Sequence, residues 1–476
     1  MEEIFIVLAL YLVLLFGLAL WSRKSTHTLK GYFIAGRELP PAVVAFSTNA
    51  TGQSGWLLLG LTGMGYAVGA QAFWVVLGEV VGISLAWLLV ARRFKRLADE
   101  ADAITVPDVL AWRFQDRRHV LRLLSAGIIL LMVGTYVAAQ LVAGGKTLSG
   151  FTSLDYPAAV LLGAVVIIGY TLVGGYKAVA WTDLIQGLAM WIGLLAIPIA
   201  AILAAGGWSA MLDTLAAQDP AYLSPWGSDG TGLKGMVAVL SFLAIGWGFL
   251  GMPQLLVRFM SARSEQSLVP AMRISIVVLA CFGAGAVLTG MAGRALMPGL
   301  EDQEAILPLL AQDLFNPWIT GVIMVVVLAA IMSTVDSLLI LASSALVRDV
   351  LQQARGVAAS EQRMARFGKA VTMFIGVLGV IFALHQTPLI FWFVLFSWNG
   401  LGAAFGPPVL CALWYRSTTL AGAVAGMLSG FLTTVCWLLF FKESAYNLLE
   451  IVPGFLVGLL VTLLVSRFTA PRAQLP

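Results

Sequence analysis

Long runs of hydrophobic residues alternate with short polar segments along the entire chain. Each run has about 20 residues, the length with which an α-helix crosses the hydrocarbon core of a bilayer. No polar segment is long enough for a separate soluble domain. The pattern predicts thirteen membrane-spanning helices, over residues 3–22, 42–64, 70–91, 122–145, 157–176, 183–205, 235–257, 273–297, 317–347, 369–385, 390–414, 419–441 and 446–467.

The composition favours the same fold class. Of the 476 residues, 60% are hydrophobic and only 11% are charged, whereas a soluble domain has about 25% charged residues. So few charges could not cover the surface of a soluble protein. Soluble enzymes, nucleic-acid-binding proteins, disordered proteins and secreted scaffolds are therefore excluded. We expect an all-α polytopic membrane protein with the lipid bilayer as a partner; its oligomeric state is left open.

Positive charges are divided unevenly between alternate connecting segments. Of the 28 Lys and Arg residues, all except Lys146, Lys234, Arg294 and Lys442 fall on one set of loops. Because cytoplasmic loops carry such an excess, we expect a multi-pass protein of the cell (inner) membrane with its N-terminus outside and its C-terminus in the cytoplasm. The first hydrophobic run lacks the basic segment and cleavage site of a signal peptide, so it should be a retained helix.

Two of the predicted spans contain residues that interrupt helices. The second has a polar, Gly-rich middle over residues 47–56, and the seventh contains three glycines and a proline over 246–253. Irregular backbone is tolerated at membrane depth only where it lines a cavity or is buried in protein. The two spans lie five apart, so a second five-helix unit would enter the membrane from the opposite side. This spacing indicates an inverted repeat with a central transport site; the alternative is that these residues serve helix packing alone.

Small and hydroxyl-bearing residues form one face of the ninth predicted span. Ala330, Ser333, Thr334 and Ser337 are three or four residues apart and are therefore neighbours on a helix, and Asp336 borders their face. Hydroxyl and carbonyl oxygens suit a hard cation. We therefore expect an ion site here, although Ser and Thr can also bond back to their own helix without further function.

The acids Asp183 and Glu79 also lie inside predicted spans, where ionisable side chains are costly and usually functional. Asp183 follows Trp181 and Thr182 at the start of the sixth span, where it either caps the helix or belongs to an ion pathway. Glu79 lies in the middle of the third span without an evident partner. We expect no enzyme, ATP-driven pump or organic cofactor, because the chain has neither a Cys/His cluster with metal-ligand spacing nor a Walker A motif.

Motifs along nearly the whole chain resemble those of the sodium:solute symporters, and within them the sodium/proline symporter-like branch. The matching segments include Ser54-Gly55-Trp56-Leu57-Leu58, Thr105-Val106-Pro107-Asp108, Trp181-Thr182-Asp183, Arg258-Phe259-Met260, Ala329 to Thr334 and Gly402 to Pro407. The resemblance implies a five-plus-five inverted-repeat (LeuT-like) core over residues 42–414, with broken helices 2 and 7. An N-terminal helix and loop (1–41) and C-terminal helices (415–476) would flank this core within a single transport domain.

The resemblance also implies the site residues, with Na⁺ as the coupling ion. Sodium would bind between the second and ninth spans, to the carbonyls of Ala50, Gln53 and Ala330 and the hydroxyls of Ser333 and Thr334. A second sodium site or an exit route would use Asp183, Asp336 and Ser337. The small-molecule substrate would contact Ser54, Gly55, Tyr136, Phe249 and Pro253.

The chain departs from the proline pattern at positions near the substrate. Gly52 replaces an aspartate, Phe249 replaces a tyrosine, and the tryptophan of the seventh span is Trp247 only if a gap is allowed, and Ile245 otherwise. Glu79 has no acidic counterpart and could meet an ammonium or guanidinium group of the substrate. We expect sodium-coupled uptake of L-proline or a related amino acid by alternating access. The alternatives are symport of pantothenate, a sugar, a sialic acid or a monocarboxylate, and a membrane sensor built on a transporter scaffold.

Overall fold

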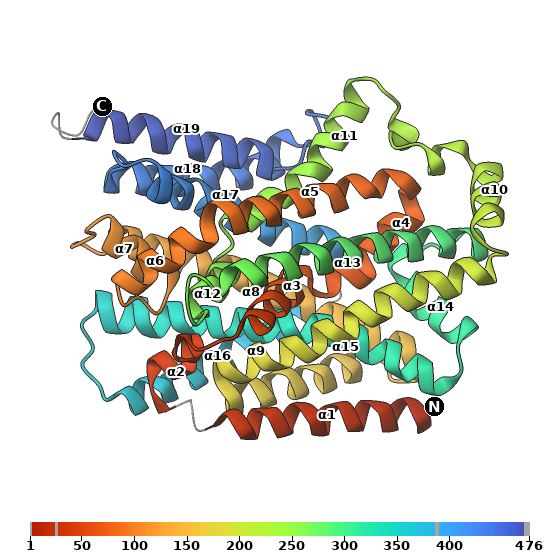
Figure 1. Ribbon diagram of the computed structural model, residues 1–476, viewed down its shortest axis with the longest axis horizontal. Helices are drawn as coiled ribbons and strands as arrows, with labels where there is room; N and C mark the ends of the chain where they lie inside the picture. Colours follow the sequence, from red (N-terminus) through yellow and green to blue (C-terminus); the bar gives the residue numbers. More distant parts are fainter. Residues whose placement is uncertain (1, 24–26, 386–389, 471–476) are drawn as a thin grey trace.

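The computed structural model describes residues 2–23, 27–385 and 390–470, and among these the named elements are all helices. Most of the long helices run along the same axis of the molecule (Figure 1). Lys24 and Arg472, which belong to the predicted basic loops, lie outside the described residues. The all-α fold predicted from the hydrophobic runs is confirmed.

The long hydrophobic runs form helices close to their predicted positions. These are α1 (Glu2–Ser22), α3 (Pro41–Gly55), η3 (Trp56–Leu61), α4 (Thr62–Val68), α5 (Phe73–Leu85), α8 (Val120–Phe151), α9 (Tyr156–Ala204), α11 (Leu233–Ala244), η8 (Ile245–Leu250), α12 (Pro253–Ser261), α13 (Leu268–Leu296), α15 (Pro317–Ser344), η10 (Ala345–Ala354), α16 (Glu361–Ala383), α17 (Ile390–Trp414), α18 (Leu420–Cys436) and α19 (Ile451–Thr469). The connecting segments contain shorter helices that the pattern did not predict, namely α2 (Leu29–Ile34), α6 (Arg92–Glu100), α7 (Val106–Arg113), α10 (Trp208–Gln218) and α14 (Ile306–Leu314).

Eleven helical stretches of the described chain are long and apolar enough to cross a membrane. Two of them, Pro41–Glu100 and Tyr156–Ala204, have 60 and 49 residues, whereas one crossing needs about 20. Each contains a glycine with positive φ, 58° at Gly69 and 61° at Gly175, a backbone conformation that glycine adopts without strain. Two crossings in each of these stretches would agree with the sequence pattern; the total of thirteen stays a prediction.

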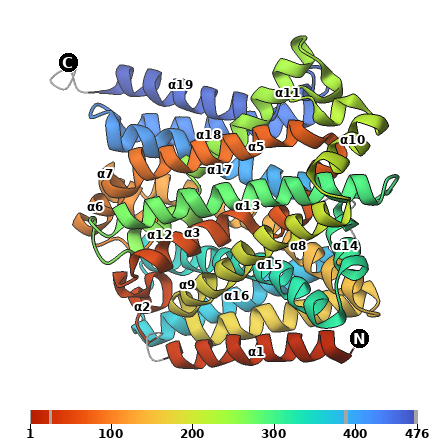
Figure 2. The same cartoon turned by 45° about the vertical axis from the view of Figure 1, so that its right-hand side comes forward.

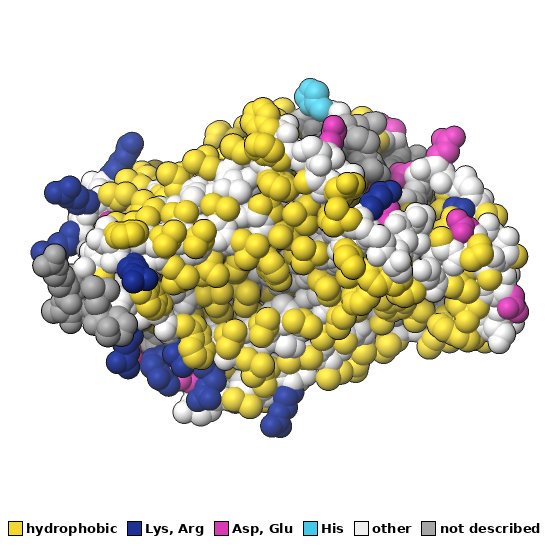
Figure 3. Space-filling view, turned by 90° about the horizontal axis from the view of Figure 1, so that it is seen from above, with side chains coloured by type: hydrophobic (Ala, Val, Ile, Leu, Met, Phe, Trp, Pro, Cys, Tyr) yellow, Lys and Arg dark blue, Asp and Glu magenta, His cyan; other side chains and the backbone are white. Residues whose placement is uncertain are grey.

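Charged side chains gather at the two ends of the molecule, and hydrophobic side chains cover the surface between them (Figure 3). Lys and Arg lie mostly at the end that contains α2, α6 and α7, and Asp and Glu at the other. Basic residues that the loop pattern assigns to the acidic end pair with acids there: Lys234 Nζ lies 2.8 Å from Asp229 Oδ1, and Lys442 Nζ lies 3.0 Å from Glu450 Oε2. A lipid bilayer around the apolar middle fits this distribution.

The two interrupted helices run in opposite directions beside each other. Leu39, just before α3, forms an isolated bridge with Ala262, just after α12. Leu39 N–H donates to the Ser261 carbonyl (3.1 Å), and Arg263 N–H donates to the Leu39 carbonyl (3.2 Å). The beginning of the first broken helix therefore meets the end of the second, as an inverted repeat requires. Figure 2 shows α3 and α12 next to each other.

Candidate ion and substrate site

The first predicted break is present within the second span. Ser54 has φ 55° and ψ −172°, a conformation that costs free energy in a non-glycine residue. The chain then continues through a π-helical segment, η3, into α4. Trp56 N–H donates to Ser54 Oγ (3.1 Å), and Gly55 N–H donates to Gln140 Oε1 of α8 (3.0 Å). Side chains thus pair backbone donors at the break, in a region that is fully buried.

The second predicted break is present within the seventh span. The tight 3₁₀ segment η8 follows α11, and α12 begins only at Pro253. Trp398 Nε1 donates to the Ile245 carbonyl (2.8 Å), and the Trp398 ring packs edge-on against Phe249 with 5.0 Å between centroids. A hydrogen bond and an aromatic contact from Trp398 therefore hold this break.

The hydroxyls predicted as sodium ligands lie where α15 contacts α3. Ser333 Oγ is 3.1 Å from the Ala50 carbonyl and 3.0 Å from the Ala330 carbonyl. Thr334 Oγ1 is 3.1 Å from the Thr51 carbonyl and 3.3 Å from the Ala330 carbonyl. All five residues are fully buried. The structure thus brings together four of the five predicted ligands, and their oxygens are of the type that hard cations prefer.

Asp183, Asp336 and Ser337 also lie close together, around a residue that we expected elsewhere. Arg258 of α12 was expected in a cytoplasmic loop, but its side chain is 1% exposed. Its Nη2 lies 3.2 Å from Asp183 Oδ2 and also donates to Ser337 Oγ. Asp336 accepts a hydrogen bond from the Tyr170 hydroxyl. The loop assignment was wrong because a guanidinium that pairs with a buried carboxylate can itself be buried.

Asp183 connects several helices rather than capping one. Helix α9 turns at Gly175 and then continues through Asp183, so the capping interpretation is wrong. Ser47 Oγ donates to Asp183 Oδ2 (2.6 Å), and Thr51 Oγ1 lies 3.4 Å from the same oxygen. Because Thr51 also provides the carbonyl that Thr334 contacts, the carboxylate cluster adjoins the α3–α15 contact.

Two of the predicted substrate residues, Glu79 and Tyr136, line a closed cavity of about 10 Å³. This volume is enough for about one water molecule, so the central site is closed in this structure. The other lining residues are Gly52, Trp56, Ile245, Val394, Leu395 and Trp398. The remaining predicted substrate residues, Ser54, Gly55, Phe249 and Pro253, are buried at the two breaks and are not among those that line this cavity.

Glu79 has a partner that the sequence did not reveal. Gln53 Nε2 donates to Glu79 Oε1 (3.2 Å), and both side chains are buried. The backbone carbonyl of Gln53, the fifth predicted sodium ligand, accepts the N–H of Trp56. Gln53 therefore contacts α5 through its side chain while its backbone lies one turn beyond Ala50 in α3.

A family model of the sodium:solute symporter family matches residues 32–430. The chain belongs to this family. A sodium/proline symporter of Staphylococcus aureus is 34% identical over 98% of this chain and 93% of its own length. A solved structure of a Na⁺-coupled sialic acid symporter has a TM-score of 0.82 at 20% identity and covers 99% of both chains. A nucleobase-cation-symport-1 family transporter has a TM-score of 0.54 at 15% identity, over 92% of this chain and 95% of that one.

Membership confirms the family and the transporter fold that the motifs predicted. The chain is a multi-pass sodium:solute symporter, with Na⁺ as its coupling ion. The identity of the two structural neighbours is low, so their likeness shows the fold alone. In the seventh span, Ile245 lines the central cavity, whereas the Trp247 ring packs 5.5 Å from that of Phe455 in α19.

A larger cavity of about 510 Å³ lies at the acidic end of the symporter. Ile245 and Leu395 line both this cavity and the closed central one. Its other lining residues include Asp229, Lys234 and Lys442. The apolar side chains of Ile245 and Leu395 therefore lie between the central cavity and the larger cavity at the acidic end.

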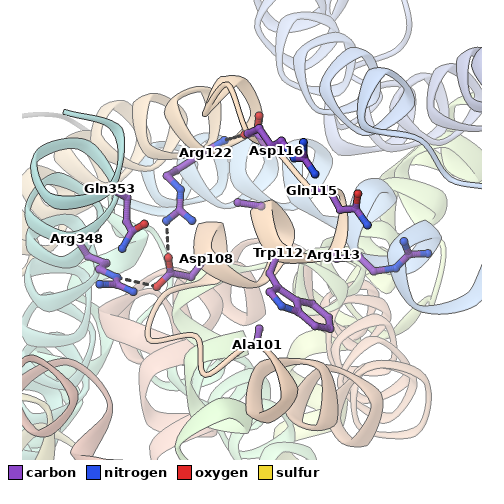
Figure 4. Close-up of a pocket in the computed structure, with 11 residues that line it drawn as sticks. Ala101, Asp108, Trp112, Arg113, Gln115, Asp116, Arg122, Arg348 and Gln353 are labelled. Atoms are coloured by element: carbon purple, nitrogen blue, oxygen red, sulfur yellow. Dashed lines mark hydrogen bonds and ion pairs between the residues drawn. The ribbon is translucent and has the colours of Figure 1, made fainter. Parts of the chain in front are cut away.

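A cavity of about 730 Å³ lies at the basic end, beside α7 (Figure 4). Arg122 pairs there with Asp108 and, at 2.7 Å, with Asp349 Oδ1. Arg348 Nε lies 3.0 Å from Asp108 Oδ2, and Thr105 Oγ1 donates to Asp349 Oδ1 (3.0 Å). These contacts tie α7 and α8 to η10, the continuation of the helix that carries Ser333 and Thr334.

An exposed ion pair also connects the short helix α2 to the loop after α6 at this end. Lys30 Nζ lies 2.5 Å from Asp102 Oδ1. This hydrogen bond lowers the pKa of the Asp102 carboxyl below its ordinary value. Both side chains are largely exposed, so the pair contributes little to stability.

Proposed function

We propose that this symporter uses the sodium gradient to accumulate L-proline or a related small amino acid in a bacterial cell. The observation that carries the proposal is the contact of the Ser333 and Thr334 hydroxyls with α3 carbonyls, one turn before the break at Ser54. Proline is supported by the similarity to the sodium/proline symporter of Staphylococcus aureus, which matches over nearly the whole chain.

Na⁺ would bind at the α3–α15 contact in place of the hydroxyl–carbonyl hydrogen bonds. The proposed ligands are the carbonyls of Ala50, Gln53 and Ala330 and the hydroxyls of Ser333 and Thr334. The Gln53 carbonyl lies directly before the break, so a small adjustment of the backbone there would free it from Trp56 N–H. Binding would hold the broken second span against α15.

For Asp183, Asp336 and Ser337, we favour a role in the sodium exit route over a second sodium site. Arg258 already provides a positive charge beside Asp183. A small cavity of about 10 Å³ also lies next to this cluster, lined by Arg258, Ser337 and Ile104 among others. Ile104 directly precedes the Thr105 that bonds to Asp349 at the basic end, so the cavity lies on a path from the sodium site toward that end.

Alternating access would open each end of the central site in turn. Movement of Ile245 and Leu395 would open it to the acidic end, which we assign to the outside, and separation of the Arg122 ion pairs would help to open it to the basic, cytoplasmic end. This orientation places the N-terminus outside and the C-terminus in the cytoplasm, with thirteen spans, a core over 42–414 and flanking segments over 1–41 and 415–476.

The energetics of one coupled ion suffice for strong accumulation. A membrane potential of 100 mV contributes about 2.3 kcal/mol per charge, and a tenfold sodium gradient adds about 1.4 kcal/mol. Together they support accumulation of roughly a few hundredfold, since each 1.4 kcal/mol is tenfold.

Uptake by proteoliposomes against a panel of solutes tests this proposal. We expect an inward sodium gradient to drive accumulation of labelled L-proline, and unlabelled proline to compete. If pantothenate, a sugar, a sialic acid or a monocarboxylate is taken up with the sodium gradient and proline does not compete, that solute is the substrate instead of proline. Sodium-dependent ligand binding without uptake would favour the sensor alternative.

A further inference from the structure

Glu79 lies in α5, whose backbone comes very close to the backbone of the second break. Gly78 and Gly82 flank it, and a Cβ at Gly82 would lie 2.0 Å from the Gly246 carbonyl oxygen of η8. A Cβ at Gly78 would lie 2.5 Å from the Leu243 carbonyl oxygen. The absence of side chains at these two positions lets the backbones touch and fixes the carboxyl group of Glu79 between the two broken helices.

Two buried polar atoms near Glu79 make no hydrogen bond of ordinary geometry. They are the Tyr136 hydroxyl and Gln53 Oε1, and both residues are fully buried. Leaving such atoms unpaired in a dry interior is costly. Both oxygens can accept a hydrogen bond, and Tyr136 lines the central cavity together with Glu79. The Tyr136 hydroxyl is therefore placed to receive an N–H group of a bound solute.

The charge in the cavity discriminates between classes of solute. Glu79 is the acidic side chain in its lining, and the described lining residues include no Lys, Arg or His. An anionic solute would bring a second negative charge beside this carboxylate in a site that excludes water, which is strongly unfavourable. A solute with an ammonium group would instead form a charge-assisted hydrogen bond.

Gln53 connects the Glu79 carboxylate to the proposed sodium site. Its backbone follows Ala50 in α3 by one turn and immediately precedes the break at Ser54, while its Nε2 holds Glu79 Oε1 at 3.2 Å. Any shift of the Gln53 backbone when its carbonyl turns toward Na⁺ would therefore move the partner of Glu79.

We propose that Glu79, with the Tyr136 hydroxyl, binds the ammonium group of the transported solute, and that Gln53 couples this group to sodium by orienting Glu79. This inference rests on the proposed function and assigns its substrate class. Glu79 is then the specificity-determining residue, in place of the aspartate that the proline pattern expects at Gly52. Gln53 is a positioning residue whose side chain acts through Glu79.

Competition with the unaltered protein tests the substrate class. Proteoliposomes with an inward sodium gradient are given labelled L-proline, pyruvate, pantothenate, a sialic acid and glucose, each with unlabelled prolinamide or N-acetyl-proline as competitor. We expect the transported solute to carry an ammonium group, prolinamide to compete, and N-acetyl-proline, which lacks the charge, to compete at least about tenfold less well. Sodium-driven transport of an uncharged or anionic solute would overturn the inference while leaving sodium symport intact. Absence of sodium-driven transport for every solute would overturn the proposed function as well.

Variants test the roles of the two side chains. Glu79→Gln should raise the KM for the solute by about tenfold or more, and Glu79→Asp should recover part of this loss. Gln53→Leu keeps the backbone carbonyl but removes the amide. Sites that are coupled change each other's affinity by about 5- to 150-fold, so the ratio of KM at low and high sodium should fall toward one in Gln53→Leu.

Gln186→Leu provides the matched control, because Gln186 is also a buried amide and its Nε2 donates to the Tyr11 hydroxyl, 2.7 Å away. It should retain the sodium dependence of KM. If a variant transports too slowly, the same ratio is measured from the solute concentration that raises the melting temperature of the purified protein. Unchanged KM in Glu79→Gln, or an unchanged ratio in Gln53→Leu, would contradict the assigned role.

Discussion

The two broken helices differ in what surrounds them. At the first break, Ser54 has a strained backbone, and the preceding turn of α3 presents carbonyl oxygens to hydroxyls of α15. At the second break, the 3₁₀ segment η8 packs through glycines against α5, and its Phe249 packs against Trp398. One break thus gathers oxygen atoms, and the other provides close apolar contacts. The two halves of an inverted repeat can therefore share a geometry and divide the tasks of ion binding and access control.

The polar side of this comparison includes a contribution from the second broken helix. Arg258 lies near the end of α12, yet its guanidinium bonds to Thr51 Oγ1 (2.7 Å) of α3 and to Asp183 of α9. The buried Arg258–Asp183 ion pair therefore joins the two repeats next to the proposed sodium ligands. Its integrity should therefore matter for folding as well as for transport.

The largest effect is expected from Asp183→Asn, which leaves Arg258 without its ion-pair partner in the interior. Removing one member of a buried pair costs about 3–5 kcal/mol. The melting temperature in detergent should fall markedly. Asp302→Asn is the control, because Asp302 is 47% exposed in its pair with Lys146 and such pairs contribute about 0–1 kcal/mol. Equal melting temperatures of the two variants would show that the Arg258–Asp183 ion pair does not stabilise the fold.

Gly246→Val should disturb the second break and its contact with α5. A Cβ at this position would lie 1.8 Å from the Gly78 carbonyl oxygen, and overpacking costs about 1–3 kcal/mol. We expect lower stability and slower transport, measured by melting and initial uptake rates, while the sodium requirement of the remaining transport is unchanged. Gly127→Val is the control, since a Cβ there meets nothing within 4 Å. A changed sodium requirement in Gly246→Val would contradict the division of tasks.

Ser333→Ala should change the sodium dependence without large loss of stability. An interaction of a polar group with a charge is worth about 1.5–3 kcal/mol, so the sodium concentration for half-maximal uptake should rise about tenfold or more; Thr334→Ala should act in the same direction. Ser343→Ala is the control in the same helix, where Ser343 Oγ bonds to the Gly368 carbonyl (2.8 Å). If both serine variants need the same sodium concentration as the wild type, Ser333 is not a ligand.

The smallest effect is expected from Phe249→Tyr at the second break. The Phe249 ring is fully buried, packs against Trp398, and faces Gly52, where a Cβ would lie 3.3 Å from the ring. An added hydroxyl needs a partner in this environment. The KM for the solute should change about threefold, a free-energy change of about 0.7 kcal/mol, with no change in sodium dependence. An unchanged KM for every transported solute would place Phe249 outside the substrate site.

The positions of both breaks could be predicted from sequence because helix-breaking residues act locally. Polar and glycine residues around Ser54 and the glycines before Pro253 destabilise a helix wherever the rest of the chain lies. Ser333 and Thr334 were found for a similar reason, since helical spacing places them on one face. Local rules therefore identified both the broken helices and the hydroxyl face of α15.

Tertiary pairings could not be predicted in this way. Gln53 and Glu79 are 26 residues apart on different helices, and no periodicity connects them. Arg258 looked like a loop residue because Arg263 follows it closely and loops carry most basic residues. Its burial is decided by Asp183, which lies 75 residues earlier in the chain. Such partners become visible only when the helices are packed.

The most direct test of the ion site is the flux of sodium itself. Proteoliposomes that contain the purified symporter are given labelled Na⁺ outside, with or without an inward gradient of the transported solute. The wild type should take up labelled Na⁺ faster when the solute gradient is present, and the double variant Ser333→Ala, Thr334→Ala should lose this stimulation. Equal solute-stimulated sodium uptake by both proteins would show that Na⁺ crosses the membrane without these oxygens.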